Sequence, residues 1–177
     1  MGDGPKINSE VQWAKDYYAQ KLAATEKGLF SFDKLMSTNG SSDNMKANVK
    51  SPSWEAAVPG ISNFFDFVET PLNNTSKKAS AMQLSSSRNN TPQMNKDVVD
   101  ATFDRLIIYR NDEGKINERI VTYIPDANYA RSHQGNIKHN KINQLDEDFD
   151  GYLMYKTWED ELLFILRIEK GKAIKKY

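Results

Sequence analysis

The chain has 177 residues, and its 24 Lys and Arg residues balance 24 Asp and Glu residues, so the formal net charge is zero. This balance excludes recruitment of nucleic acid or of an anionic membrane through a global positive field. Because the sequence contains no cysteine, disulfide frameworks, thiol nucleophiles and cysteine-based zinc sites are also excluded.

An amphipathic helix is predicted over Glu10–Lys27. Ser9 is a suitable N-cap, Gln12 stands at the capping-box position, and Gly28 is a natural C-terminal stop. Apolar side chains recur at helical spacing and form a stripe that predicts packing against a sheet. The stripe consists of Val11, Ala14, Tyr17, Tyr18 and Leu22.

The region that follows alternates between polar segments and one apolar segment. Ser37–Ser53 is rich in Ser, Asn, Gly and Lys, which predicts a long loop. Ile61–Val68 is rich in phenylalanine and predicts a strand that ends at Pro71. Asn73–Asn95 predicts a second long loop, with room for a short edge strand at Ala81–Ser85.

A β-hairpin is predicted over Val98–Ile124. Its two apolar runs flank the turn Asn111–Lys115, in which Gly114 occupies the position where a type I turn with a bulge requires a left-handed residue. The polar segment Asp126–Gln144 comes next and begins with a predicted helical turn at Asp126–Arg131. Three further strands are predicted at Tyr152–Thr157, Leu162–Ile168 and Lys172–Tyr177.

These elements predict one α+β domain over residues 1–177. One apolar helical stripe precedes strands joined by short turns, which leaves no room for parallel crossovers. We therefore expect the N-terminal helix to pack on a curved antiparallel β-meander of about five to seven strands.

An acidic segment resembles the first half of a calcium-binding loop. Asp146, Asp148 and Asp150 supply oxygens at positions one, three and five, and Gly151 follows at position six. The twelfth position is Thr157, where the loop requires a bidentate glutamate. The segment is therefore interpreted as a solvated turn before a strand, with weak calcium binding as the alternative.

His133 and His139 are the only histidines of the chain and lie six residues apart. They could bind zinc if carboxylates such as Asp126 or Asp146 converged on them, but neither a helix nor a strand places such a pair side by side. We therefore expect solvent-exposed loop histidines, no tightly bound metal and no cofactor.

No nucleophile elbow of the Gly-x-Ser-x-Gly type and no glycine-rich phosphate loop occurs in the sequence. No catalytic residues are therefore predicted, and a hydrolase would need a pocket that joins His133 or His139 to a carboxylate and a serine. Among the tryptophans, Trp158 precedes the acidic turn Glu159–Glu161 and is the one most expected to be exposed. Trp158 and Trp54 are the candidates for a contact surface.

The order of motifs resembles a group of uncharacterised secreted or lipid-anchored bacterial proteins of the Bacteroidota type. The motifs are Pro52–Ala57, Val68–Leu72, Arg105–Arg110 with Gly114-Lys115, Ile120–Asp126, Leu145–Tyr152 and Glu169–Lys172. The resemblance covers nearly the whole chain, but its motifs are structural and none is a catalytic signature. It implies an extracytoplasmic location with the leader removed. It also implies that the chain is an N-terminal piece of a longer protein.

The resemblance and the absence of a catalytic motif together predict a non-enzymatic, extracytoplasmic binding or accessory domain, such as the soluble part of a surface lipoprotein. Its expected partner is a protein or a glycan. Nucleic acid is not expected, and the membrane is expected only through a removed leader or lipid anchor. The alternative is a peptidase-associated inhibitory or pro-domain module, in which a helix-on-sheet unit covers a protease cleft.

Overall fold

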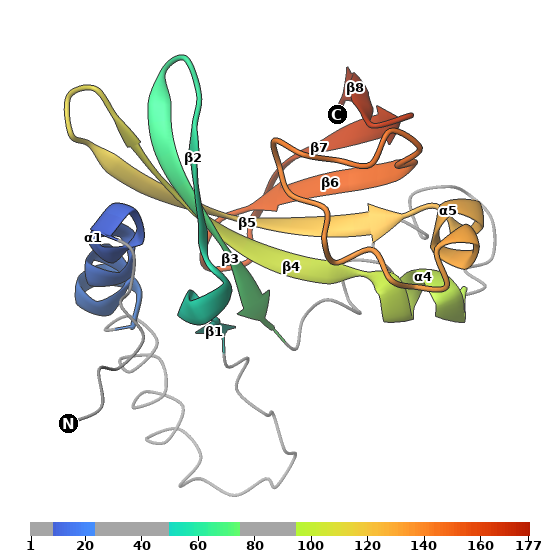
Figure 1. Ribbon diagram of the computed structural model, residues 1–177, viewed down its shortest axis with the longest axis horizontal. Helices are drawn as coiled ribbons and strands as arrows, with labels where there is room; N and C mark the ends of the chain where they lie inside the picture. The colour runs from blue at the N-terminus through green and yellow to red at the C-terminus, as the bar shows by residue number, and fades with distance from the viewer. Residues whose placement is uncertain (1–8, 24–49, 75–94) are drawn as a thin grey trace, which may run out of the picture.

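One antiparallel β-sheet forms the centre of the structure, a computed structural model that describes residues 9–23, 50–74 and 95–177 (Figure 1). The strands are β1 (Ser51–Pro52), β2 (Val58–Ile61), β3 (Phe65–Asn73), β4 (Phe103–Asn111), β5 (Ile116–Pro125), β6 (Gly151–Lys156), β7 (Leu162–Glu169) and β8 (Lys172–Lys176). The helical elements are α1 (Ser9–Tyr17), the π-helical turn η1 (Tyr18–Leu22) that continues it, the 3-10 turn η2 (Trp54–Ala56), α4 (Lys96–Ala101) and α5 (Ala127–Ser132).

The sheet contains eight strands in the order β1-β3-β4-β5-β6-β7-β8, with β2 also paired to β3. The structure thus confirms an antiparallel sheet with an N-terminal helix, but the strand number is eight rather than about five to seven. The difference in strand number arises at the edge of the sheet formed by β1 and β2. There β1 pairs with the end of β3 at Leu72 and Asn73, whereas β2 pairs with its beginning at Asp66–Glu69.

The prediction of one strand over Ile61–Val68 is wrong, because the chain reverses inside that range. The hydroxyl of Ser62 accepts from the Phe65 backbone N–H at 3.2 Å, and the Ser62 N–H donates to the Phe65 carbonyl at 2.9 Å. Ile61 therefore ends β2 while β3 begins at Phe65. Pro71 lies within β3 rather than ending it, and its carbonyl accepts from the Ser53 N–H at 2.9 Å.

Two further predicted boundaries are corrected. The hairpin strand begins at Phe103 rather than Val98, because Lys96–Ala101 forms α4 and the Asn95 side chain caps it by accepting from the Asp97 N–H at 3.0 Å. Within the predicted loop Ser37–Ser53, Ser51–Pro52 forms β1.

Other predicted elements are confirmed. Gly114 has a φ of +78° in the β4–β5 turn, and α5 occupies the predicted helical turn after Asp126. The strands β6, β7 and β8 lie where the three C-terminal strands were predicted. The N-terminal helix begins at Ser9 and buries Val11, Ala14 and Leu22.

Some predictions concern residues outside the described part of the chain. These are the end of the first helix at residues 24–27 with its stop at Gly28, most of the loop 37–53, and residues 75–94 of the loop 73–95. The short strand proposed at Ala81–Ser85 falls in the last of these ranges.

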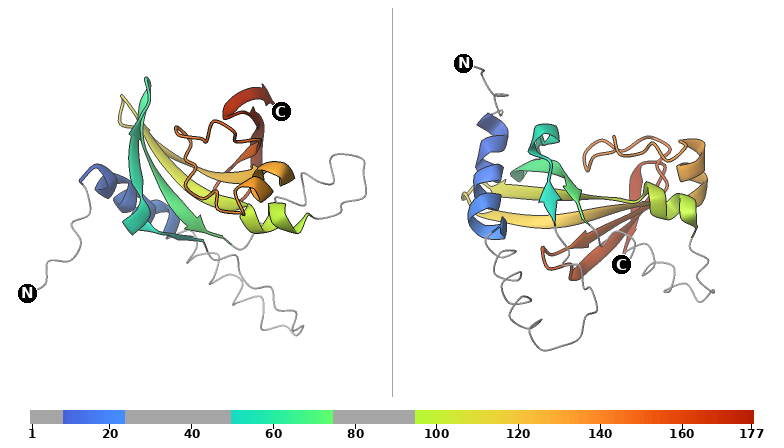
Figure 2. Two further views of the ribbon diagram at one scale, coloured as in Figure 1. Left: turned by 45° about the vertical axis from the view of Figure 1, so that its right-hand side comes forward. Right: turned by 90° about the horizontal axis from the view of Figure 1, so that it is seen from below.

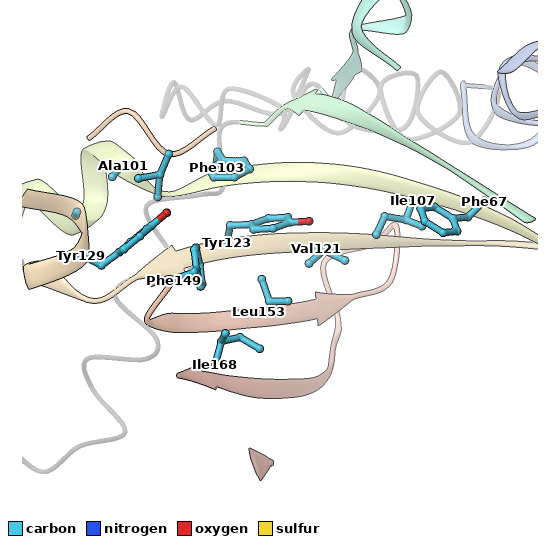
Figure 3. Packing of buried hydrophobic residues seen from close by; sticks show 12 residues of the cluster. Phe67, Ala101, Phe103, Ile107, Val121, Tyr123, Tyr129, Phe149, Leu153 and Ile168 are labelled. Carbon is cyan, nitrogen blue, oxygen red and sulfur yellow. The ribbon is translucent and has the colours of Figure 1, made fainter. Parts of the chain in front are cut away.

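The sheet is curved (Figure 2), and its buried apolar side chains form two large clusters and a small third one of Ile124, Tyr152 and Met154. On the concave face, α5 and the loop that follows it cover the side chains shown in Figure 3. On the convex face, α1 packs over a second set of apolar side chains. The concave core comprises Phe67, Ala101, Phe103, Ile107, Val121, Tyr123, Tyr129, Ala130, Ile137, Phe149, Leu153 and Ile168. The convex core comprises Val11, Ala14, Leu22, Val68, Leu72, Leu106, Ile108, Ile120 and Trp158.

Candidate functional site

An apolar pocket of about 500 Å³ opens on the concave face of the sheet. Six strands, β2 to β7, contribute to its walls, because alternate residues of neighbouring strands point to the same face. The loop between α5 and β6 forms one lip of the pocket, through Ile142 and Asn143. The lining residues are Ile61, Ser62, Phe65, Phe67, Ile107, Tyr109, Arg119, Ile142, Asn143, Tyr155 and Phe164. Such a volume with mainly apolar walls is typical of a site for a small molecule.

Among the described residues that line the pocket, Arg119 is the only charged one. The Arg119 guanidinium lies 5.8 Å from the ring centre of Tyr109 and donates to the Glu118 carbonyl at 2.5 Å. Burial raises the pKa of Tyr155, so its hydroxyl stays protonated at neutral pH. The pocket can therefore pair an apolar body with a negatively charged or hydrogen-bonding group of a ligand.

The rim of the pocket exposes large apolar side chains. Ile61 is 83% exposed and Phe64, in the β2–β3 turn, is 76% exposed. Phe65 packs against Tyr109 inside the pocket at 5.5 Å between ring centres, yet remains 37% exposed. An apolar rim continuous with an apolar pocket is a surface that a ligand or partner can cover.

Glu69 is fully buried beside the pocket and fixes the loop that forms its lip. Its carboxylate accepts from the Tyr123 hydroxyl at 2.7 Å and from the Ile142 backbone N–H at 3.0 Å, and Arg105 lies 3.5 Å away. Burial raises the pKa of Glu69 above its ordinary value, although these donors and Arg105 oppose the shift. Because Ile142 lines the pocket, this carboxylate positions part of the binding surface.

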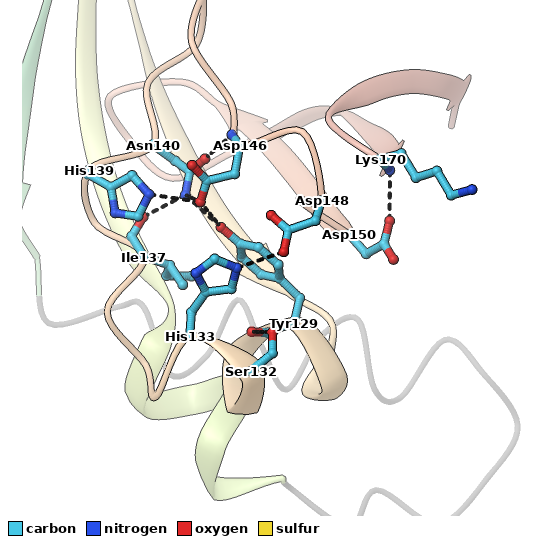
Figure 4. A network of polar contacts seen from close by, with 10 residues as sticks. All are labelled: Tyr129, Ser132, His133, Ile137, His139, Asn140, Asp146, Asp148, Asp150 and Lys170. Carbon is cyan, nitrogen blue, oxygen red and sulfur yellow. Dashed lines mark hydrogen bonds and ion pairs between the residues drawn. The ribbon is translucent and has the colours of Figure 1, made fainter.

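A second polar cluster gathers at the other end of the same loop (Figure 4). His133 Nε2 lies 2.8 Å from Asp148 Oδ2, and His139 Nε2 lies 2.8 Å from Asp146 Oδ2. The Tyr129 hydroxyl also donates to Asp146 Oδ2, at 2.6 Å. Partial burial acts to raise the pKa of Asp146, but the hydrogen bonds from Tyr129 and His139 outweigh it and hold the pKa below its usual range. The structure therefore places each histidine beside an aspartate, a geometry that the residue spacing alone does not predict.

The three aspartates of the half calcium loop, Asp146, Asp148 and Asp150, do not face one common centre. Asp146 and Asp148 face the histidines, whereas Asp150 accepts from the Lys170 backbone N–H at 2.8 Å (Figure 4). The serine next to His133 does not complete a catalytic triad, because Ser132 Oγ donates to the Tyr129 carbonyl at 2.9 Å.

The expected exposure of Trp158 is wrong. Trp158 is only 2% exposed and packs edge-on against Tyr18, at 5.8 Å between ring centres. The Lys50 ammonium lies over its ring, 5.1 Å from the centre. Trp54 is half-buried and also packs against Tyr18. Trp158 therefore belongs to the core beneath α1 rather than to a contact surface.

The backbone of the turn Asp146–Asp150 lies in close contact with Gly171, which is in the β7–β8 turn. Gly171 has a φ of +69°, and a Cβ placed there would lie 2.5 Å from the Asp146 carbonyl oxygen. The Gly171 N–H also donates to the Phe149 carbonyl at 2.9 Å. Only glycine satisfies both the conformation and the space at this position.

Gly171→Ala is expected to destabilise the protein by about 2–3 kcal/mol in urea unfolding, because it adds a backbone clash to the left-handed conformation, which alone costs about 1–2 kcal/mol. Gly114→Ala is the matched control, because Gly114 has a φ of +78° but nothing lies within 4 Å of an added Cβ. Equal losses in the two variants would contradict a role for the contact with Asp146.

The pocket residues were not identified from the sequence. The pocket forms only when six strands that are distant in the sequence are placed around it. One signal was present: Phe65, Phe67, Ile107 and Tyr109 follow the period of two that puts apolar groups on one sheet face.

The chain matches no protein-family model, no curated protein and no solved structure. Among the described residues, none of the helices has the length and apolar character needed to cross a membrane.

Proposed function

We propose that this protein is a non-enzymatic binding module whose concave pocket takes a small amphipathic ligand with an apolar body and an anionic group. The observation that carries the proposal is the apolar pocket of about 500 Å³ with Arg119 as its charged wall residue. An extracytoplasmic setting is part of the proposal and rests on the resemblance of the chain's motifs to secreted and lipid-anchored proteins.

The apolar part of the ligand would contact the aromatic rings of the wall. Tyr155 and Phe164 stack at 4.4 Å between ring centres, so one side of the pocket presents a flat aromatic surface. Burial of an alkyl or aryl group against such walls contributes about 25 cal/mol for each Å² removed from water.

The anionic part would pair with Arg119. This residue is half-buried, so a charge-assisted hydrogen bond to it is less weakened by solvent than one at an open surface. A second cation, Lys176, lies near the pocket wall, with its ammonium 4.2 Å from the centre of the Phe164 ring. Two positive groups near one apolar cavity favour a carboxylate or sulfonate over a cationic ligand.

Binding of decanoate and decanol, measured by isothermal titration calorimetry, tests this proposal. We expect saturable binding of decanoate at one site, weakened roughly 10-fold or more in Arg119→Gln because a charge-assisted hydrogen bond is lost. Decanol binding should be nearly unchanged by this substitution. Asn143→Trp, which adds bulk at the exposed lip, should weaken both ligands.

Arg110→Gln is the matched control, because Arg110 is on the neighbouring strand but pairs with Asp66 and stacks over Trp13, outside the pocket. Displacement of the fluorescent sulfonate 1-anilinonaphthalene-8-sulfonate by decanoate would give an independent reading. Absence of binding by every probe, or equal losses in Arg119→Gln and Arg110→Gln, would overturn the proposal.

A further inference from the structure

The geometry of the loop after α5 points to a divalent transition-metal site formed by His133, Asp146 and Asp148, with zinc as its best-suited ion. This inference concerns a different part of the molecule from the pocket and does not rest on the proposed function. It also replaces the expectation, drawn from spacing alone, that the chain binds no metal tightly.

The three side chains offer one nitrogen and two carboxylate oxygens within 4.8 Å of one another. In the part of the chain that the structure describes, this is the one group of three or more such residues that meets this distance. Donor atoms of a tetrahedral zinc ion lie about 3.3 Å apart when each metal–ligand bond is about 2.0–2.1 Å. Small side-chain rotations therefore bring the three donors to coordination distance.

The ligand types favour zinc over calcium. Calcium takes six to eight oxygen ligands, whereas an imidazole nitrogen with carboxylates suits zinc and its neighbours in the first transition row. Two carboxylates also balance the charge of a divalent cation. Asp150, the third oxygen of a calcium loop, is held away by the Lys170 backbone N–H.

The ligands are held in place by groups that do not themselves bind the metal. Asp146 Oδ2 accepts from Tyr129 and lies 2.8 Å from His139, while the Asp146 backbone N–H donates to Asn140 at 2.7 Å. His133 packs against the Tyr129 ring at 4.4 Å between ring centres. Outer hydrogen bonds of this kind fix the orientation of metal ligands, and their loss typically weakens binding by about 10–100-fold.

The site is open to solvent on one side. The side chains of His133 and Asp146 are 28% and 26% exposed, and that of Asp148 is 65% exposed. A metal ion can therefore enter without unfolding, and a water molecule can complete its coordination. Three protein ligands with an open position are the arrangement that zinc adopts where it remains accessible to small molecules.

A zinc titration of this protein is specific, because the sequence offers few nitrogen or sulfur donors outside the proposed site. Histidine nitrogen and cysteine sulfur are principal zinc donors in proteins, and the whole sequence has no cysteine and only two histidines, His133 and His139. Chelator-treated protein should be titrated with zinc chloride and, separately, with calcium chloride by isothermal titration calorimetry. We expect one zinc ion per chain, and no calcium heat at the same concentrations.

Two variants test the ligands, and one serves as a control. His133→Gln and Asp148→Asn should each weaken zinc binding by more than the roughly 10–100-fold typical of an outer contact. Asp150→Asn, which removes a carboxylate of the same turn outside the cluster, should bind zinc as the unaltered protein does. Nitrogen-15 spectra of the unaltered protein should show zinc shifting the His133 Nε2 resonance, which identifies the ligand without any substitution.

The outcomes that overturn the inference are equally definite. They are the absence of zinc heat, an unmoved His133 resonance at saturating zinc, or zinc binding that survives both ligand substitutions. Calcium binding that Asp150→Asn abolishes would show instead that the acidic half-loop is the metal site.

Discussion

Glu69→Ala is expected to destabilise the protein by about 3–5 kcal/mol, the cost typical of removing one partner from a buried ion pair. The substitution leaves the guanidinium of Arg105, which is 5% exposed, without its counter-charge. It also removes the acceptor of the Tyr123 hydroxyl and of the Ile142 N–H. Urea unfolding followed by circular dichroism measures the loss.

Asp66→Ala provides a matched control, because Asp66 is on the same strand and pairs with an arginine of the same neighbouring strand. The side chains of Asp66 and Arg110 are 53% and 39% exposed, so this pair should contribute no more than about 1 kcal/mol. Losses of similar size in the two variants would contradict a special role for the buried carboxylate.

The effect of Glu69 should also depend on pH. Burial raises the pKa of Glu69 above its ordinary value of 4.5, so the folded state holds the carboxyl proton more tightly than the unfolded chain does. The contribution of this residue to stability is therefore complete below about pH 4.5 and declines as the pH rises through the raised pKa. The difference between the unaltered protein and Glu69→Ala should accordingly shrink from low to high pH.

Trp158→Ala is the second substitution with a large expected effect, about 3–5 kcal/mol, because it leaves a cavity where a large ring fills the space beneath α1. Urea unfolding followed by circular dichroism again measures the loss of stability. Trp54→Ala should cost clearly less, because Trp54 is only half-buried although it touches the same Tyr18 ring. If Trp158→Ala instead left stability unchanged and impaired partner binding, Trp158 would be a contact residue after all.

The strands and the hairpin turn could be predicted from the sequence because their signals are local. The alternation along β4 and β5 and the position of Gly114 each lie within a few residues of the structure they determine. The start of α4 also had a local signal, the capping residue Asn95, but the apolar run that begins at Val98 favoured a strand. The capping residue Asn95 was the correct signal for this segment, and the apolar run was not.

The burial of Trp158 and Glu69 could not be predicted because it depends on distant segments. Trp158 follows a strand and precedes acidic residues, which favours exposure, yet Tyr18 near the N-terminus covers it. Glu69 looks like the polar residue of an alternating strand, but its partners Arg105 and Tyr123 are on β4 and β5. Only the assembled sheet brings such groups together.

The cluster around His133 eluded prediction for a different reason, namely the path of the backbone. Gln134 and Gly135 adopt φ values of +53° and +74° immediately after α5, and this reversal returns the chain toward the acidic turn. His133 and Asp148 thereby meet across fifteen residues. Helical and strand periodicities do not describe such a path, so residue spacing gave no geometry for the site.

The exposed edge of the sheet at β8 has a consequence for how molecules of this protein meet one another. A free edge strand offers unpaired backbone groups to any other chain, which favours side-by-side aggregation. Every residue of β8 is exposed, and Lys172, Lys175 and Lys176 carry three positive charges along it. A second copy approaching this edge would set lysine against lysine, so the charge of the strand discourages self-association that its backbone would otherwise permit.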